Sequence, residues 1–306
     1  MAKFAIFTYL FEIIENTTDP ELFPMEETVN PQESWNRKQE LLASFFAQGP
    51  RVELKKNMTS EDTYDNLIEE NPLDKDIIIL RVANKHNTKL EQGFVDNKMT
   101  YSPSVLVLID NRKDMQRIAI QQSTKSFSDV QTVAKILERS LCAYLRKYRL
   151  SVKICPKRHS KDFWKIADQH QTDVVWIRFN LTHPNLPALD DLVCQFDEMA
   201  KALNVDPFVG GTALQDQVVT LNRDSQFLCR LVEACAATGQ SIHMKTKDNV
   251  EFECYVDNDE EGNIVTEDLK SKAINALRDK RESRDMFESP IAKLNEFMYQ
   301  LKFSYE

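Results

Sequence analysis

The chain has 306 residues, 42% hydrophobic and 28% charged, so it is long enough for one large or two ordinary domains and is not globally disordered. Six glycines and 11 prolines exclude collagen-like and linker-like chains, and no apolar run reaches the roughly 20 residues of a membrane span. The net charge of −9 is unevenly distributed, which bears on partners rather than on the fold.

The first third of the sequence predicts a strand, a helix and a second strand. Residues 3–14 are apolar and rich in aromatic and β-branched side chains, which predicts a strand rather than a signal peptide. Asn30 and Pro31 are typical of the cap and first position of a helix, which Gly49 ends. Residues 76–82 form a short apolar run that predicts a buried strand.

A hairpin followed by a helix is predicted in the middle of the chain. The apolar runs 104–110 and 116–121 bracket a polar turn, so we expect them to pair as antiparallel strands. Ser128 is expected to cap the next helix, in which apolar side chains recur at helical spacing over residues 128–148.

The remaining elements continue the mixture of strands and helices. They are a strand at 151–155, a short helix around Phe163, a strand at 173–181, a helix over 189–203, a strand at 217–221, a helix over 225–238 ended by Gly239, a hairpin over 241–256 and two C-terminal helices separated by Ser289 and Pro290.

The order of these elements predicts an α+β (mixed α/β) fold. We expect a mixed or mainly antiparallel sheet with hairpins at 104–121 and 241–256, helices packed on it, and a helical C-terminus. An N-terminal α/β domain of residues 1–181 and a C-terminal α+β domain of residues 182–306 are expected, with one continuous unit as the alternative.

The predicted hairpin and the helix after it carry a family resemblance. Residues 104–137, SVLVLIDNRKDMQRIAIQQSTKSFSDVQTVAKIL, resemble the corresponding portion of the phage lambda exclusion protein RexA and of small bacterial anti-phage defence proteins. An apolar strand, a short turn, a second strand and a Ser/Asp-rich approach to a helix occur there in the same order. The resemblance implies a DNA-binding sensor in anti-phage defence and is compatible with a membrane partner. It brings no catalytic residue, since the segment contains none.

Sequence motifs for catalysis, metals and cofactors are absent. There is no GxxxxGK, GxGxxG, HExxH or GxSxG, and the five histidines do not fall at metal-ligand spacing, so we expect no cofactor and no metal site. Glu53 and Lys55 have the ExK spacing of metal-dependent nucleases and stay an alternative. Cys155 and His159 leave open a nucleophilic pair, although a buried inert thiol is preferred at Cys155. Scattered cysteines without CxxC favour reduced thiols in a cytoplasmic protein.

One basic segment stands out in an acidic chain. Residues 146–165 carry eight cations against Asp162, a net of +7, whereas residues 1–70 carry −8 and residues 251–306 carry −6. Such a segment can neutralise phosphates and release counterions. The predicted nucleic-acid-binding residues are Arg146, Lys147, Arg149, Lys153, Lys157, Arg158, Lys161 and Lys165.

Two other interpretations of this segment stay open. Tyr148, Phe163 and Trp164 are interleaved with the cations and could stack on bases, but core positions are expected for at least two of them. Basic side chains at the end of a helix also offset its dipole without any ligand.

The sequence thus predicts a non-enzymatic, cytoplasmic nucleic-acid-binding protein of bacterial or phage type, with DNA favoured over RNA. Homo-oligomerisation or a partner protein is expected through acidic surfaces or the C-terminal helix. The alternatives are a metal-dependent nuclease using Glu53 and Lys55, and an adaptor or scaffold whose basic face docks an acidic protein.

Overall fold

The computed structural model describes residues 2–14, 30–57, 62–92, 95–113, 115–170, 172–179, 210–211, 221, 223–254, 264–269, 274 and 289–301. The chain forms two compact units. Unit 1 comprises Met1–Ile154 and Thr266–Leu301, and unit 2 comprises Cys155–Val265 and Lys302–Glu306. Both combine helices with antiparallel sheets, which confirms the predicted α+β class.

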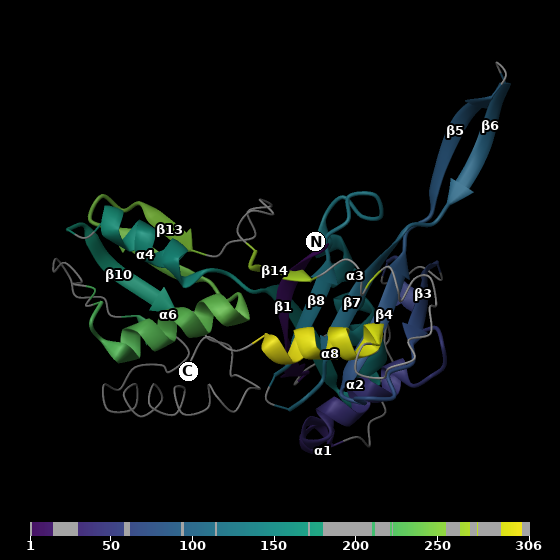
Figure 1. The fold of residues 1–306 in the computed structure, drawn as a ribbon. Coiled ribbons are helices and arrows are strands. Elements are labelled where there is room, and N and C mark those ends of the chain that lie inside the picture. The colour runs from purple at the N-terminus through teal and green to yellow at the C-terminus, as the bar shows by residue number, and fades with distance from the viewer. Residues whose placement is uncertain are drawn as a thin grey trace, which may run out of the picture. The chain divides into compact units, whose positions relative to one another are not determined.

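The core of unit 1 is one large sheet (Figure 1). Its strands, in spatial order, are β14 (Thr266–Leu269), β1 (Ala2–Ile13), β8 (Arg117–Gln121), β7 (Ser104–Asp110), β4 (Ile77–Ala83), β3 (Thr63–Glu69) and β2 (Leu54–Lys55), and β9 (Leu150–Pro156) also pairs with β1. The first strand of the chain is therefore bordered by strands more than 100 residues away in sequence.

The predicted hairpin is confirmed. Strands β7 and β8 pair antiparallel, with Val107 opposite Ile120 and Asp110 opposite Arg117. All five residues of β8 are buried, because the strand lies between β7 and β1 inside the sheet. Both backbone edges of β8 are therefore paired, and its two isoleucines, Ile118 and Ile120, share one face.

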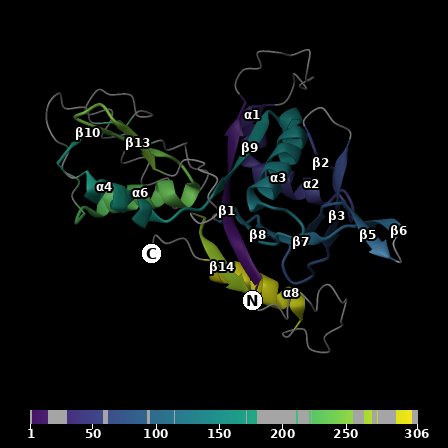
Figure 2. The same ribbon diagram turned by 90° about the horizontal axis from the view of Figure 1, so that it is seen from above.

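Helices cover both faces of the unit 1 sheet. Figure 2 shows α2 (Lys38–Phe46) and α3 (Val130–Leu145) on one face and α8 (Pro290–Gln300) on the other, while α1 (Pro31–Asn36) precedes α2. A short 3-10 turn, η1 (Arg146–Tyr148), continues α3. Because both faces are covered, the central part of β1 is buried without alternation.

The helix starts follow local capping chemistry. The side chain of Asn30 accepts a hydrogen bond from the amide of Gln32 at 2.9 Å, as predicted for this cap. The predicted Ser128 cap is wrong, since the carboxylate of Asp129 accepts from the amide of Gln131 at 2.8 Å and α3 begins at the next residue. An anionic acceptor also interacts favourably with the helix dipole.

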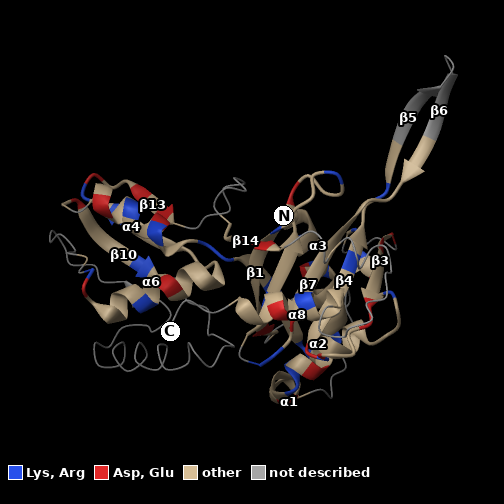
Figure 3. Ribbon diagram, in the orientation of Figure 1, with Lys and Arg blue, Asp and Glu red and all other residues tan. Residues whose placement is uncertain are grey.

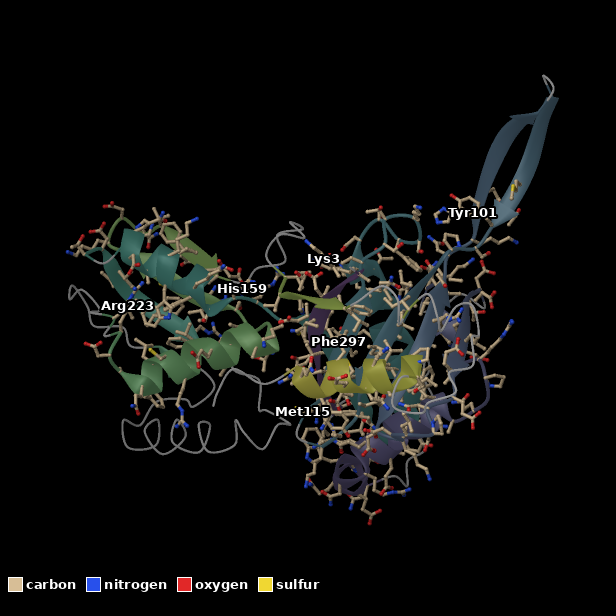
Figure 4. The ribbon with its side chains drawn as sticks, in the orientation of Figure 1. Lys3, Tyr101, Met115, His159, Arg223 and Phe297 are labelled. Atoms are coloured by element: carbon tan, nitrogen blue, oxygen red, sulfur yellow. The ribbon has the colours of Figure 1, made fainter. Side chains whose placement is uncertain are left out.

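The C-terminal helix α8 packs on the sheet of unit 1. Leu294 and Met298 are buried, and the ring of Phe297, labelled in Figure 4, lies 5.2 Å from that of Phe4 on β1. Ser289 caps the helix by accepting from the amide of Ala292 at 3.1 Å.

Unit 2 is a smaller antiparallel sheet with two described helices. The strand order is β11 (Gly210–Gly211), β10 (Val174–Phe179), β12 (Ile242–Thr246) and β13 (Glu251–Cys254), and α4 (Ser160–Gln169) and α6 (Gln226–Thr238) supply apolar side chains to the same core. The predicted hairpin over 241–256 is confirmed by the pairing of β12 with β13. Gly239 ends α6 with a left-handed φ of 65°, as predicted.

The units divide the chain at a different place from the expected boundary after residue 181. Strand β10 pairs with β12 in the sheet of unit 2, whereas β14 and α8 return to unit 1. The predicted helix at 189–203, the predicted strand at 217–221 apart from its last residue, and most of the segment before Ser289 lie outside the described residues.

A second hairpin of unit 1 was not predicted from the sequence. Strands β5 (His86–Gln92) and β6 (Val95–Tyr101) pair with each other along their whole length. The hairpin extends away from the end of the sheet at which β4 and β7 connect to it (Figure 1).

Candidate nucleic-acid interface

The basic segment is shared between the two units. Unit 1 contains four of the eight predicted cations and unit 2 contains the other four, because the division falls after Ile154. The expectation that all eight lie on one surface therefore stays a prediction. Figure 3 shows basic and acidic residues interspersed on the described elements of both units.

In unit 1 the cations surround the turn that follows α3. Lys147 is exposed, and its ammonium nitrogen lies 4.5 Å from the ring centroid of Tyr144 and 4.9 Å from that of Tyr148. Arg149 has a left-handed φ of 59°, and its carbonyl accepts a hydrogen bond from the amide of Ile14 at 2.9 Å. Ile14, the residue after β1, thus holds this turn, and the tyrosine rings attract the lysine by cation–π interaction.

A carboxylate lies among these cations. Glu138 of α3 accepts a hydrogen bond from the amide of Ile154 at 2.6 Å. Burial raises the pKa of Glu138, while that hydrogen bond and the charge of Lys153 oppose the rise. Lys153 itself is exposed on β9. Glu138 therefore offsets part of the local positive charge without covering the lysine.

Helix α3 extends the basic surface of unit 1 beyond the predicted segment. Lys135, Arg139 and Arg146 are spaced by four and seven residues, so they lie on one side of the helix. The guanidinium of Arg139 also donates a hydrogen bond to the carbonyl of Lys56, just after β2. Helical spacing could have revealed Lys135 and Arg139 from sequence, but only the tertiary fold brings Lys56 to them.

In unit 2 the exposed cations of the predicted set are on α4. Lys161 and Lys165 are exposed and four residues apart, hence on one face of the helix. Phe163 is 0% exposed, and Trp164 packs partly buried against the same core with the guanidinium of Arg223 5.1 Å from its ring. These two aromatic residues occupy core positions, as one of the sequence interpretations expected, and are not open platforms for base stacking.

Two predicted cations lie deeper in unit 2. Arg158 is 3% exposed, and its amide donates to the carbonyl of Ala236 at 2.7 Å. Lys157 is half-buried, and its carbonyl accepts from the amide of Val265 at 2.9 Å. The exposed cations of the predicted set are therefore four lysines: Lys147, Lys153, Lys161 and Lys165.

The alternative catalytic sites gain no support from the geometry. Glu53 is exposed before β2, and the amide of Lys55 donates to the hydroxyl of Ser140 at 2.9 Å. Within the described ranges, no three or more His, Cys, Asp or Glu side chains gather where they could hold a metal ion. Cys155, the first residue of unit 2, is buried, as preferred for an inert thiol. Burial also raises the pKa of Cys254 to about 12.

Of the helices that the structure describes, none combines the length and the apolar character needed to cross a membrane. Comparison with known proteins found no matching family model, no matching curated protein and no matching solved structure.

Proposed function

We propose that this protein is a non-enzymatic nucleic-acid-binding protein that contacts the phosphate backbone through the lysines of residues 146–165. The observation that carries the proposal is a net charge of +7 in this segment of a chain with net charge −9, with Lys147, Lys153, Lys161 and Lys165 exposed. Salt screens the acidic remainder beyond about 8 Å at physiological ionic strength, so a local patch can act inside a negative protein.

The proposed ligand is DNA, and the proposed setting is the cytoplasm of a bacterial cell. Residues 104–137, which resemble anti-phage exclusion and defence proteins, form β7, β8 and the first half of α3. Helix α3 leads directly into the basic turn at Arg146. A DNA-sensing component of anti-phage defence is the role that this resemblance supports.

The proposal is tested by the salt dependence of binding to duplex DNA. If the four exposed lysines each neutralise one phosphate, log K falls against log salt with a slope of about −3.6. The double variants K147E/K153E in unit 1 and K161E/K165E in unit 2 should each weaken binding and make the slope shallower by about 1.8, whatever the DNA sequence.

A matched control separates local contacts from net charge. Lys113 and Lys293 are exposed lysines of unit 1 outside the segment, so K113E/K293E changes the net charge by the same amount. This variant should bind like the wild type at physiological salt. No binding at low salt, or equal weakening by the control, would contradict the proposal and favour the adaptor. Mg²⁺-dependent cleavage of the DNA, abolished by Glu53→Ala, would instead establish the nuclease.

A further inference from the structure

The sheet of unit 2 has an inner face in the core and an outer face that its described helices do not cover. Helices α4 and α6 lie on one side of β10 and β13 (Figure 2), and both supply side chains to the core on the inner face. Side chains alternate between the two faces of a strand. The partly exposed side chains on the outer face of β10 and β12 are Trp176, Arg178, His243 and Lys245.

A β-bulge in β10 brings Trp176 to the outer face. Val174 lies opposite Thr246, and both are buried. The register then shifts, so that Trp176 lies opposite Lys245. Strict alternation would place Val174 and Trp176 on the same face. The bulge instead keeps Val174 in the core and turns Trp176 outward, and bulges often re-aim a side chain in this way at functional sites.

Arg178 adds a cation without a counter-ion to the same strand. In the described part of the chain, Nε of Arg178 is buried without a hydrogen-bond partner, and none of the ion pairs of unit 2 there involves its guanidinium. The neighbouring strand β11 has Gly211 opposite Arg178, so it places no side chain beside the guanidinium. An anion that approaches β10 would therefore meet an uncompensated positive charge.

The other charges of the outer face are paired between β12 and β13. Nζ of Lys245 lies 3.4 Å from Oε1 of Glu251, and Nε2 of His243 lies 3.4 Å from Oε1 of Glu253. The outer face is thus divided, with carboxylates at the β13 edge and an aromatic ring and an unpaired cation on β10. An anionic ligand is attracted to the β10 side and repelled at the β13 edge.

We propose that Trp176 and Arg178 bind single-stranded nucleic acid, with one base stacked on the indole and a phosphate beside the guanidinium. Every nucleotide of a single strand offers both an aromatic face and a negative charge. Residues two apart on a strand are separated by about 6.6–6.8 Å, so one nucleotide can contact both side chains. A duplex keeps its bases stacked on one another, and an acidic peptide supplies the charge without the ring, so neither matches the pair.

This site goes beyond the proposed function and does not rest on it. Lys161 and Lys165 are exposed on α4, which packs on the inner face of the sheet, whereas Trp176 is on the outer face. Contacts with duplex DNA through these lysines and stacking on Trp176 use different sides of unit 2. The K161E/K165E variant should therefore weaken duplex binding and leave stacking on Trp176 intact.

The fluorescence of Trp176 tests the stacking directly. In the full-length W35F/W164F background, Trp176 is the only one of the three tryptophans that remains. Oligothymidylate of about 15 nucleotides should quench its emission saturably, because a stacked base contacts the indole. An abasic oligonucleotide of the same length has the same phosphates without the bases, and it should quench little. Equal quenching by the two ligands, or none by oligothymidylate at low salt, would overturn the proposal.

Substitutions test the two contacts separately, with binding followed by the fluorescence anisotropy of labelled oligothymidylate. Trp176→Ala should weaken binding at least about fivefold, whereas Trp176→Phe keeps a ring and should retain most of the affinity. Arg178→Gln should make the slope of log K against log salt shallower by about 0.7, the value for one phosphate of a single strand.

Arg230→Gln is the matched control for the charge change. Arg230 is exposed on α6, away from the outer face, so its loss should leave the salt slope as in the wild type. Equal effects of Arg178→Gln and Arg230→Gln, or unchanged affinity in Trp176→Ala, would refute the inference. Retained binding in Trp176→Phe alongside its loss in Trp176→Ala would support stacking on this ring.

Discussion

Replacing Leu294 with alanine is expected to destabilise unit 1 by about 3 kcal/mol. Leu294 of α8 is 0% exposed. The substitution removes three carbon atoms, which corresponds to about 2.4 kcal/mol of transfer free energy at about 0.8 kcal/mol per buried carbon. A cavity that the neighbouring core closes only in part adds to this, and the sum lies within the range of about 2–5 kcal/mol for such substitutions.

Tryptophan fluorescence can follow the unfolding of unit 1 alone, because unit 1 contains one of the three tryptophans and the other two can be replaced. Trp35 is in α1, whereas Trp164 and Trp176 are in unit 2. In a W164F/W176F background, urea unfolding followed by tryptophan fluorescence therefore reports unit 1. For a unit of about 150–250 residues, the expected loss also corresponds to a fall in Tm of roughly 6–12 °C.

Lys293→Ala is the matched control for this experiment. Lys293 is the exposed neighbour of Leu294 on the same helix, and lysine and alanine are both good helix formers. Its free energy of unfolding should stay within about 0.5 kcal/mol of the wild type. If Leu294→Ala behaved like this control, α8 would not be packed on the sheet and the reasoning would fail.

Two further substitutions test the turn after α6 and the buried carboxylate of α3. Gly239→Ala should lower the unfolding free energy of unit 2 by about 2 kcal/mol or more. The φ of Gly239 is 65°, and an added Cβ would lie 2.7 Å from the carbonyl oxygen of Pro156. A variant as stable in urea as the wild type would contradict this. Burial raises the folded-state pKa of Glu138 above the ordinary value of 4.5. The protonated carboxyl therefore stabilises the folded state below pH 4.5, and this stabilisation is lost as the pH rises through the folded-state pKa. Glu138→Gln should therefore gain stability relative to the wild type between pH 4.5 and pH 7, and a pH-independent difference in unfolding free energy would exclude this effect.

Local chemistry in the sequence determined where many elements begin and end. Asn30 and Ser289 cap their helices, and Gly239 ends α6, because side-chain acceptors and left-handed backbone act within a few residues. The hairpins at 104–121 and 241–256 follow from turn residues between apolar runs. The predicted cap, Ser128, lies one residue before the actual cap, Asp129, because either side chain can cap a helix.

The β5–β6 hairpin was not predicted from the sequence. Residues 86–101 carry no regular alternation of apolar and polar residue types, which is the pattern that predicts a half-buried strand. Hydrophobic periodicity reports burial against the same chain. The pairing of β5 with β6 along their whole length became visible only in the structure.

Sequence composition by itself determined that residues 146–165 are strongly basic in an acidic chain, because charge is a property of residue type alone. Only the tertiary structure decided that the segment is shared between two units, that Arg158 is buried, and that Lys56 joins Arg139. It also placed β14 and α8 on the sheet that β1 begins. Burial and long-range pairing depend on neighbours from distant parts of the chain, and no local pattern encodes which neighbours those are.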